Sequence, residues 1–512
     1  MESRIQHGWF GPANPQLQQP RRELIAGAPP RRVILPREVR GDLATIAAAA
    51  RTAGNGRSAA GARLVSEAEA LVVRRATTGP TTADYAHIGS MGADAWLDEQ
   101  LDFEQLDNAA LEDALHAAFP TLSLSAKELF QQYDDNRFIP IYELWAATFY
   151  RALYSPRQLF ERMATFWSDH FSIDIFGENM ELLKPVDDRD VVRSHTLGEF
   201  PALLSASAHS PAMLSYLTND TNEKNHPNEN YARELMELHT MGADRGYSEK
   251  DVKEVARCLT GWTWNGPYCD ATGELGTFQF VEYLHDNRTK RVLGKTIGSG
   301  GSVNDGEQVL AILSGRKETA DHIATKMLRW LHGYEPSEKL VKSVSKSYRR
   351  SDGDIRSMVR TALRAKHLGS ATPKLKRPFH LMISALRAIG AEVEDVRQPL
   401  NRLAAAGHLP FAWVPPNGYP DTAQWWSSLL LPRWSFGTTI AGGDDVLLDP
   451  AADDPNASVG KIVDRLDTLL LNGAMTPATR TELTKFLNKR KNRERVRAAI
   501  ALAIAAPEFQ EY

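Results

Sequence analysis

Helical periodicity covers most of this 512-residue chain. From Ala62 to Ala505, apolar residues return every three to four positions in one segment after another, as in Lys317–Leu331. Only Phe278–Tyr283 clearly alternates apolar and polar residues, and Lys290–Ile297 is the segment expected to pair with it. The pattern therefore predicts a mainly α, large multi-helix globular fold with at most a small β ribbon.

Composition narrows the class of protein. With 42% hydrophobic residues the chain can bury a large core, so we expect residues 61–512 to form a helical domain, with a division into two lobes left open. Residues 1–60 are rich in Pro, Arg, Gly and Ala, which predicts an extended or partly disordered lead-in. The net charge of −4 argues against nucleic acid as a partner. The lack of an apolar run of about 18 residues argues against a membrane span.

The N-terminal region bears on localisation. Arg31-Arg-Val-Ile-Leu35 is similar to the core of a twin-arginine export signal, but Pro36 and charged residues follow where such a signal has an apolar stretch. We therefore expect a cytoplasmic protein, or a periplasmic or secreted one if it is exported together with a signal-bearing partner. Cys258 and Cys269 are too few for a disulfide framework or a four-ligand zinc site, so we expect free thiols.

The densest group of polar side chains lies in Asn228–Gly242, where the apolar residues are spaced as in a core-facing helix. On a regular helix, Glu234 falls at about 40° and Glu237 at about 340° from Asn230. Arg233 falls at about 300°. One narrow arc thus carries an amide, a guanidinium and two carboxylates. A solvated face with an Arg233–Glu237 ion pair is the ordinary interpretation, and a polar binding or catalytic site is the functional one.

Two histidines are further candidates. His239 falls at about 180° from Asn230, so on a regular helix it cannot share a metal ion with the carboxylates of the same segment. In Leu159–Phe171, His170 lies within the apolar arc at about 20° from Leu159. We therefore expect His170 to be buried and hydrogen-bonded to a polar residue of the central helical hairpin. A satisfied core histidine is the alternative to a catalytic one.

Capping residues indicate where helices begin. Ser155-Pro156 predicts an N-cap and first turn of a helix through Phe171, in which Asp169 is expected to be a surface partner of Arg162. Ser248-x-x-Asp251 predicts a capping box that opens the second helix of the central hairpin.

Tryptophans outside the predicted helices are candidates for a ligand-binding wall. Trp262 and Trp264 follow the second central helix, and the C-terminal loop supplies Trp413, Trp425 and Trp426. Such residues often line pockets for flat or sugar-like ligands, although packing against the core is the commoner role. His285-Asp286 follows the predicted strand and is interpreted as a turn, because adjacent strand residues point to opposite faces.

Several blocks of the sequence resemble those of one family, in the same order. They are Phe166-Trp-Ser-Asp-His-Phe171, Pro211–Tyr216, Asn228–Gly242, Gly246–Val252, Leu259-Thr-Gly-Trp262, Lys374-x-x-Arg-Pro378, Pro415–Pro420 with Trp425, and Ala506–Gln510. They resemble the bacterial family of domains of unknown function numbered 1800, over about Leu71–Tyr512. The resemblance implies a helical protein without an established activity and a possible alkaline-phosphatase-like partner protein. The chain departs from the family pattern at Thr218-Asn-Asp, where relatives have a sequence similar to Leu-Asp-Asn. This difference weakens a functional role for the acidic residue at that position.

These observations give three functional hypotheses. The first is a hydrolase acting on a polar polymer or saccharide through a carboxylate-lined pocket. Its catalytic residues would be Glu234, Glu237 and His170, and its substrate-binding residues would be Asn228, Asn230, Arg233, His239, Trp262 and Trp264. The alternative is a non-catalytic helical partner or scaffold for a phosphatase-like or sulfatase-like protein. The third is a metal-dependent enzyme using His170, His226 or His285. The sequence indicates no particular cofactor or oligomeric state.

Overall fold

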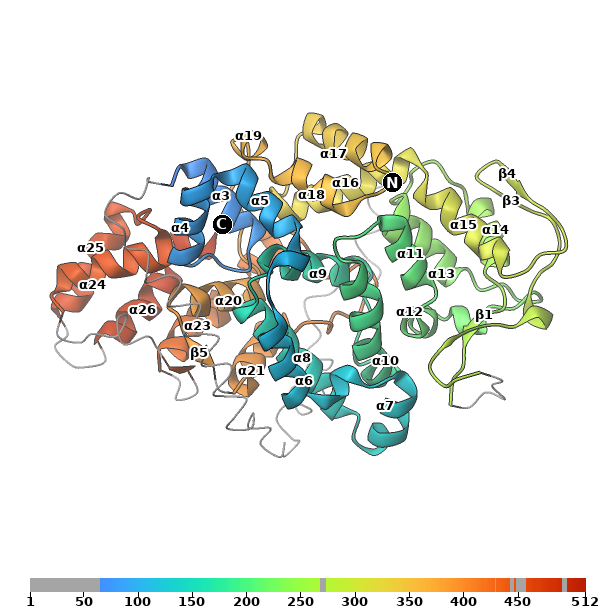
Figure 1. The fold of residues 1–512 in the computed structure, drawn as a ribbon, viewed down its shortest axis with the longest axis horizontal. Helices are drawn as coiled ribbons and strands as arrows, with labels where there is room; N and C mark the ends of the chain where they lie inside the picture. The colour runs from blue at the N-terminus through green and yellow to red at the C-terminus, as the bar shows by residue number, and fades with distance from the viewer. Residues whose placement is uncertain are drawn as a thin grey trace.

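The computed structural model describes residues 65–267, 273–393, 395–428, 430–442, 446–447, 457–489 and 495–512. Helices make up most of these ranges, so the prediction of a mainly α fold is confirmed (Figure 1). The predicted lead-in of residues 1–60 lies outside the described residues. Among the ranges above, no helix has both the length and the apolar character needed to cross a membrane.

The buried apolar residues form two clusters. The first is built from α3 (Glu67–Ala76), α4 (Thr82–Met91), α5 (Ala93–Leu101), α7 (Ala126–Tyr133), α9 (Gln158–His170), α10 (Met180–Asp187), α11 (Phe200–Ala208), α12 (Pro211–Tyr216), α13 (Glu229–Glu234), α14 (Glu249–Cys258), α15 (Asn304–Ser314), α16 (Lys317–Leu331), α17 (Glu338–Arg350), α18 (Ile355–Leu363) and α19 (Ala365–Leu368). The second is built from α6 (Ala109–Ala118), α8 (Phe138–Tyr154), α20 (Pro378–Ala388), α21 (Arg397–Ala405), α23 (Leu430–Gly442), α24 (Val459–Leu466), α25 (Pro477–Asn488), α26 (Arg495–Ala505) and α27 (Pro507–Gln510). The short helix α22 (Ala423–Ser427) precedes α23.

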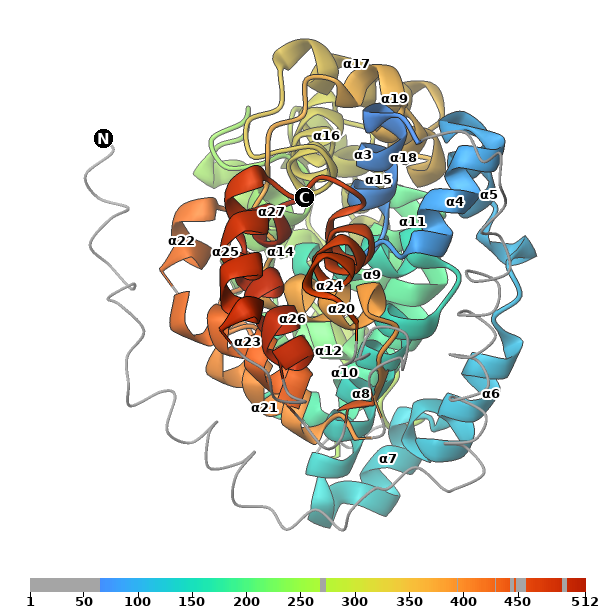
Figure 2. The same ribbon diagram turned by 90° about the vertical axis from the view of Figure 1, so that its left-hand side faces the viewer.

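These two clusters follow the long axis of the molecule. In Figure 1, helices α24–α26 lie at the left end and the strands β1, β3 and β4 at the right end, with α8 and α9 between them. Figure 2 shows the end of the chain near α3, and the Arg75 guanidinium carbon of α3 lies 4.9 Å from the centre of the Tyr512 ring. The consecutive helices α8 and α9 belong to different clusters, so the clusters meet between them.

The described strands form three short antiparallel pairs. Strand β1 (Trp262–Trp264) pairs with β2 (Phe278–Phe280), β3 (Lys290–Val292) pairs with β4 (Lys295–Ile297), and β5 (Glu392–Val393) pairs with β6 (Val446–Leu447). The predicted pairing of Phe278–Tyr283 with Lys290–Ile297 is therefore wrong. The second segment folds back on itself, because Leu293 and Gly294 both have positive φ, 48° and 83°, as a two-residue hairpin requires.

One of the two predicted helix starts is confirmed. Asp251 N–H donates to Ser248 Oγ (3.3 Å) and Ser248 N–H donates to Asp251 Oδ2 (2.9 Å), which is the capping box that opens α14. The predicted start of α9 at Ser155-Pro156 is wrong. Helix α8 continues to Tyr154, and the Ser155 N–H donates to its Arg151 carbonyl (3.0 Å), so Ser155 ends one helix instead of opening the next.

Three described segments adopt π-helical geometry: η4 (Asp188–Arg193) after α10, η6 (Leu235–Thr240) after α13 and η8 (Asp467–Leu471) after α24. The angles predicted for Glu237 and His239 assume a regular helix, and that assumption fails from Leu235 onward. A π-turn widens the helix and turns the following side chains away from the regular helical positions, and such turns occur frequently at functional sites. Segment η4 borders the cleft described next.

Candidate functional site

A cleft lies where the two apolar clusters meet, between α8, α9, η4 and the 408–419 loop. It is lined by Thr148, Ala152, Glu161, Ala164, Thr165, Ser168, Asp169, Ser172, Asp188, Arg193, Phe379, His408, Pro410, Phe411, Trp413 and Tyr419. Its volume of about 40 Å³ has room for roughly three water molecules. Three carboxylates, four aliphatic hydroxyls, the Tyr419 phenol and one guanidinium therefore share a small space.

Asp188 is the most unusual residue of the cleft. It is 5% exposed, and no donor among the described residues lies within hydrogen-bond distance of its carboxylate. Burial raises the pKa of Asp188 above its ordinary value, and Arg193 and Lys184 only partly oppose this effect. The protonated form is thus favoured more than in a free aspartate, which suits a carboxyl that donates a proton.

Glu161, unlike Asp188, has a cationic partner for its carboxylate. The Arg193 guanidinium grips it with two hydrogen bonds, Nη2 to Oε1 at 2.7 Å and Nη1 to Oε2 at 3.0 Å. This bidentate pair fixes the orientation of the carboxylate. The guanidinium also lies 5.1 Å from the centre of the Phe160 ring. The cleft thus contains one carboxylate held by an arginine and one carboxyl without a hydrogen bond from the described residues.

Asp169 is the third carboxylate in the lining of the cleft. Burial raises its pKa, although its ion pair with Arg377 works in the opposite direction. The prediction that Asp169 partners Arg162 at the surface is wrong, because the end of α9 faces the Lys374–Pro378 segment and Arg377 takes that place. Arg377 also contacts Asp421, with 3.2 Å between Nη2 and Oδ1.

Hydroxyl groups line the α8 and α9 sides of the cleft. Thr148 and Thr165 donate to carbonyls of their own helices, at 2.8 Å to Leu144 O and 3.0 Å to Glu161 O. Their oxygens can still accept a hydrogen bond. Ser168 and Ser172 have no hydrogen bond to other described side chains or backbone groups. The cleft can therefore both donate to and accept from a polar guest.

Aromatic side chains form the other side. The rings of Trp413 and Tyr419 are 5.1 Å apart between centroids, and Trp413 meets Trp425 edge to face at 5.6 Å. Trp425 is 39% exposed, so this aromatic group extends from the cleft to the surface. The prediction that C-terminal tryptophans contribute to a pocket is confirmed for Trp413, whereas Trp426 is fully buried.

The amides predicted to bind substrate have structural partners. Asn228 caps α13: its Oδ1 accepts from the Asn230 N–H at 3.0 Å, and its Nδ2 donates to Thr218 O at 3.0 Å. The Asn230 amide donates to Leu217 O at 3.0 Å. Both amides therefore hold the start of α13 against the end of α12, and neither lines the cleft.

Arg233 lies on the surface with two acidic partners. Its Nη1 and Nη2 each lie 2.8 Å from a Glu249 carboxylate oxygen, and Nη2 is 3.2 Å from Glu229. The predicted Arg233–Glu237 pair is wrong, because Glu249 at the start of α14 offers both its oxygens to the guanidinium. Arg233 thus ties the two helices of the central hairpin together.

Glu234 and Glu237, the predicted acid/base pair, are each half-buried. Burial raises the pKa of Glu234, and the neighbouring charge of Glu237 raises it further. Glu237 is close enough to affect the ionisation of Glu234, but both residues lie outside the lining of the described cleft. Two separate places in the protein thus combine carboxylates with a raised pKa.

His170 and His239 are core residues. His170 is 1% exposed and its Nε2 lies 3.1 Å from the carbonyl oxygen of His239, which confirms the predicted burial and the predicted contact with the central hairpin. The two ring nitrogens of His239 have no hydrogen-bond partner among the described residues. Burial lowers the pKa of His239 to about 3 and that of His170 well below its ordinary value. Both imidazoles are therefore neutral at physiological pH.

Trp262 and Trp264 belong to β1 and are buried. The Trp262 ring lies 4.6 Å from that of His209 and packs so closely on Gly306 that a Cβ there would meet Trp262 Cζ2 at 2.1 Å. Trp264 Nε1 donates to Asp220 Oδ2 at 3.2 Å. A substrate could stack on these rings only after the β1–β2 pair had moved.

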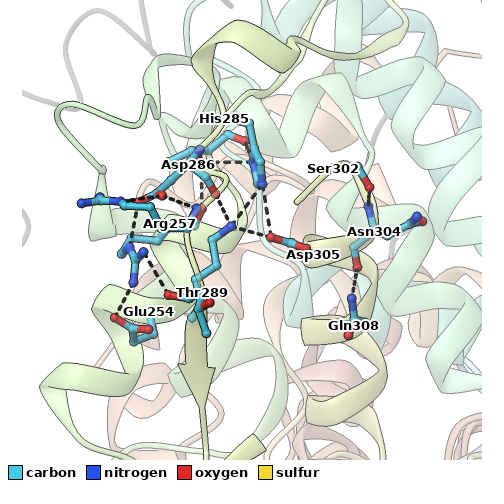
Figure 3. Close-up of polar contacts among 12 residues, drawn as sticks. Glu254, Arg257, His285, Asp286, Thr289, Ser302, Asn304, Asp305 and Gln308 are labelled. Atoms are coloured by element: carbon cyan, nitrogen blue, oxygen red, sulfur yellow. Dashed lines mark hydrogen bonds and ion pairs between the residues drawn. The ribbon is translucent and has the colours of Figure 1, made fainter. Parts of the chain in front are cut away.

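A second polar cluster surrounds His285 (Figure 3). His285 Nδ1 lies 2.7 Å from Thr260 O and its Nε2 lies 3.3 Å from Asp305 Oδ2, while Asp286 pairs with Arg257 at 2.8 Å. The imidazole and the carboxylate of this predicted turn thus have different partners. A Cβ at Gly301 would meet Asp305 Oδ2 at 2.3 Å, so the loop fills the space above this cluster. It anchors β3 and leaves no room for a substrate.

The histidines proposed as metal ligands are not gathered. His170 and His285 belong to separate buried groups, and His226 is exposed. Within the part of the chain that the structure describes, no group of three or more His, Cys, Asp or Glu side chains is arranged to hold a metal ion.

The sequence contained a signal for part of the cleft. Glu161, Thr165, Ser168 and Ser172 recur at helical spacing, which is a polar stripe beside the apolar arc of α9. Asp188 carried no comparable signal, because its exposure to the cleft depends on the π-turn and on helices far away in the sequence. The sequence thus indicated the tryptophans on one side of the cleft but not the carboxylates on the other.

Comparison with known proteins identifies the family but not the activity. Residues 71–511 match the family described as protein of unknown function DUF1800, so the chain belongs to that family. No curated protein and no solved structure matches the chain.

Proposed function

We propose that this family member is a hydrolase acting through the carboxylate-lined cleft on a polar polymer, a saccharide or a small polar molecule. The observation that supports this most is Asp188, a buried carboxyl without a hydrogen-bond partner among the described residues, facing a space rich in hydroxyls. A carboxyl that faces a cleft and whose pKa is raised by burial is a typical feature of functional sites.

The two kinds of carboxylate suggest two roles. Asp188, whose protonated form is favoured by burial, would protonate the leaving group. Glu161, held in place by Arg193, would attract and orient the attacking water or stabilise positive charge that develops in the transition state. The hydroxyls of Thr165, Ser168 and Ser172 would bind the polar groups of the substrate.

The size of the cleft limits what can enter. A volume of about 40 Å³ accepts a hydroxyl, amide or carboxyl group with its water, but not a whole sugar ring. A saccharide would therefore insert one polar group and lie against Trp413 and Trp425 outside, unless the 408–419 loop moves.

Glu234 and Glu237 are the sequence-derived candidates for the same chemistry. Glu234 has a raised pKa and a second carboxylate beside it, which are the properties of a general acid. The cleft is preferred because it encloses its carboxylates among hydroxyls and aromatic rings, whereas Glu234 and Glu237 lie outside it. Substituting each pair separately distinguishes the two.

The test is a screen of the purified full chain against glycoside, ester, amide and phosphoester substrates, followed by Asp188→Asn, Glu161→Gln and Glu234→Gln. We expect Asp188→Asn to lower kcat at least about a hundredfold while the protein stays folded. Asp190→Asn is the matched control, because Asp190 lies in the same π-turn with its side chain 54% exposed. Full activity of Asp188→Asn, or loss of activity only in Glu234→Gln, would reject the cleft. No activity on any substrate class would reject the hydrolase.

A second candidate function, that of a helical partner for a phosphatase-like or sulfatase-like protein, is favoured by an apolar surface. Val414, Trp425, Leu431 and Trp434 are 54%, 39%, 78% and 49% exposed. Large exposed apolar side chains in one stretch of chain are typical of interaction sites. Such a partner would also decide the compartment, since co-export would carry the chain to the periplasm or outside the cell. Binding to an alkaline-phosphatase-like protein that is lost in Trp434→Ser would support this role.

A further inference from the structure

Two buried arginines that lie in space beside Tyr512 have no acidic partner. Arg75 of α3 is 1% exposed and Arg162 of α9 is 3% exposed. Their guanidinium carbons lie 4.9 Å and 5.0 Å from the centre of the Tyr512 ring. Neither forms an ion pair with an Asp or Glu side chain in the described ranges. Burying a charge without a counter-charge is costly, so this arrangement calls for an explanation.

The hydrogen bonds of the two guanidinium groups leave several donors unused. Arg75 Nη2 donates to Thr372 O at 2.6 Å, but its Nε and Nη1 have no partner among the described atoms. Arg162 Nη2 donates to Tyr512 Oη at 2.5 Å, and its Nε also lacks a partner. Three charged N–H groups are thus buried and unused.

Two neutral side chains, His380 and Tyr334, add hydrogen-bond donors near these arginines. Arg162 Nη1 lies 2.6 Å from His380 Nδ1, and because a guanidinium only donates, the His380 proton must be on Nε2. That Nε2 has no partner within the described part of the chain, and the His380 ring lies 4.5 Å from the Tyr512 ring. The Tyr334 hydroxyl is likewise buried and unpartnered. The unused atoms are mostly donors, which is the pattern of a site for an anion.

The neighbouring carboxylates are already occupied. Lys374 Nζ lies 2.7 Å from Asp421 Oδ2, and Arg377 pairs with both Asp169 and Asp421. Buried Lys326 also acts on these two carboxylates, so the cations around Asp169 and Asp421 already outnumber them. No carboxylate is therefore left to neutralise Arg75 and Arg162.

We propose that Arg75, Arg162, His380 and Tyr334 bind a buried oxyanion of the phosphate type, either free phosphate or the phosphoryl group of a small molecule. Such an anion offers several strong acceptor oxygens and a double negative charge, which matches the unused donors and the excess charge. Donors come from α3, α9, α20 and the segment after α16, so a bound anion would tie these elements together. This site is independent of the hydrolase proposal.

Tyr512 itself is the competing source of negative charge. Burial would raise the pKa of its phenol, but Arg162, Lys374 and Arg75 together lower it below its ordinary value. A phenolate at Tyr512 would neutralise part of the excess without any ligand. The experiment must therefore measure both the anion and the ionisation of Tyr512.

The direct test is to denature extensively dialysed full-length protein and to measure the released anions by ion chromatography and mass spectrometry. We expect close to stoichiometric release, and the mass of the released species will tell inorganic phosphate from a phosphorylated small molecule. In protein refolded without phosphate, added inorganic phosphate should raise Tm. Arg75→Gln should weaken phosphate binding roughly tenfold or more, because one charged partner of a buried anion is lost.

Arg74→Gln is the matched control, since Arg74 neighbours Arg75 but points to Glu67 and Tyr85, and it should bind phosphate as the unmodified protein does. If Arg75→Gln does not fold, Tyr334→Phe removes one proposed donor more gently and should still weaken binding. Absence of a released anion together with an unchanged Tm in phosphate would overturn the proposal. Tyrosinate absorbance at neutral pH that disappears in Tyr512→Phe would overturn it as well, because the phenolate would then be the counter-charge.

Discussion

Asp188→Asn should stabilise the folded protein while it removes activity. The substitution keeps the shape of the side chain and removes a charge that has no hydrogen-bond partner among the described residues. Burial raises the pKa of Asp188, and each unit of difference between folded and unfolded states corresponds to about 1.4 kcal/mol. The asparagine amide is as polar and as buried as the carboxyl, so only the cost of desolvating the charge is removed. We therefore expect the free energy of unfolding to rise by about 1 kcal/mol at neutral pH.

The gain in the free energy of unfolding of Asp188→Asn should depend on pH in a defined direction. The pKa of Asp188 is higher in the folded state than the value of about 3.9 in the unfolded chain. Below about pH 4 both states bind the proton, and Asp188 imposes no penalty. As the pH rises through the folded pKa, the folded state loses stability relative to the variant. The difference between the two proteins should therefore be largest at neutral pH and disappear in acid.

Urea unfolding at neutral pH and near pH 4 measures this difference as a shift in midpoint at constant slope. Asp190→Asn, at an exposed position of the same π-turn, should change stability by no more than about 0.5 kcal/mol at either pH. Equal destabilisation of Asp188→Asn at both pH values would refute the reasoning. It would mean that the carboxylate makes a favourable interaction with Arg193 or Lys184 and is not a destabilised acid.

Three further outcomes follow from burial and charge. His170→Ala should lower the free energy of unfolding by about 1–3 kcal/mol, measured in urea, and an unchanged midpoint would contradict its role in the core. Arg377→Met should cost about 3–5 kcal/mol because Asp169 loses its ion-pair partner and Asp421 keeps only Lys374, whereas Arg349→Met on the surface should cost no more than about 0.5 kcal/mol. Burial raises the pKa of Cys258 to about 12, so in a Cys269→Ser background iodoacetamide should alkylate it only after unfolding. Rapid alkylation of the native protein would contradict this.

Helices were predictable because each one depends on its own sequence. Lys317–Leu331 has the predicted limits, and Ser248 and Asp251 cap α14 as their spacing indicates. Strand partners were not predictable in this way, because alternation marks a strand without saying which other strand it meets. The positive φ of Leu293 and Gly294 made a local hairpin, and Phe278–Phe280 then paired with a strand that follows α14.

The candidate site was only partly predictable for a related reason. The polar stripe of α9 and the tryptophans of the C-terminal loop are visible in the sequence, but their meeting is not. The central block Asn228–Gly242 attracted attention because its polar residues are adjacent. In the structure most of them cap α13 or tie it to α14, and the cleft takes its carboxylates from residues that stand alone in the sequence.

The blocks through which the chain resembles its family gain a common physical meaning in the structure. Asp169 comes from the first block, Lys374 and Arg377 from a later one, and Asp421 follows the proline-rich block. Together they form one network of ion pairs that joins segments far apart in the sequence. Asp188 and the two arginines lie outside this network. Asp188 faces the cleft without a hydrogen bond from the described residues, and Arg75 and Arg162 are buried without a carboxylate partner. These are the two places where we propose that a bound molecule supplies what the chain lacks.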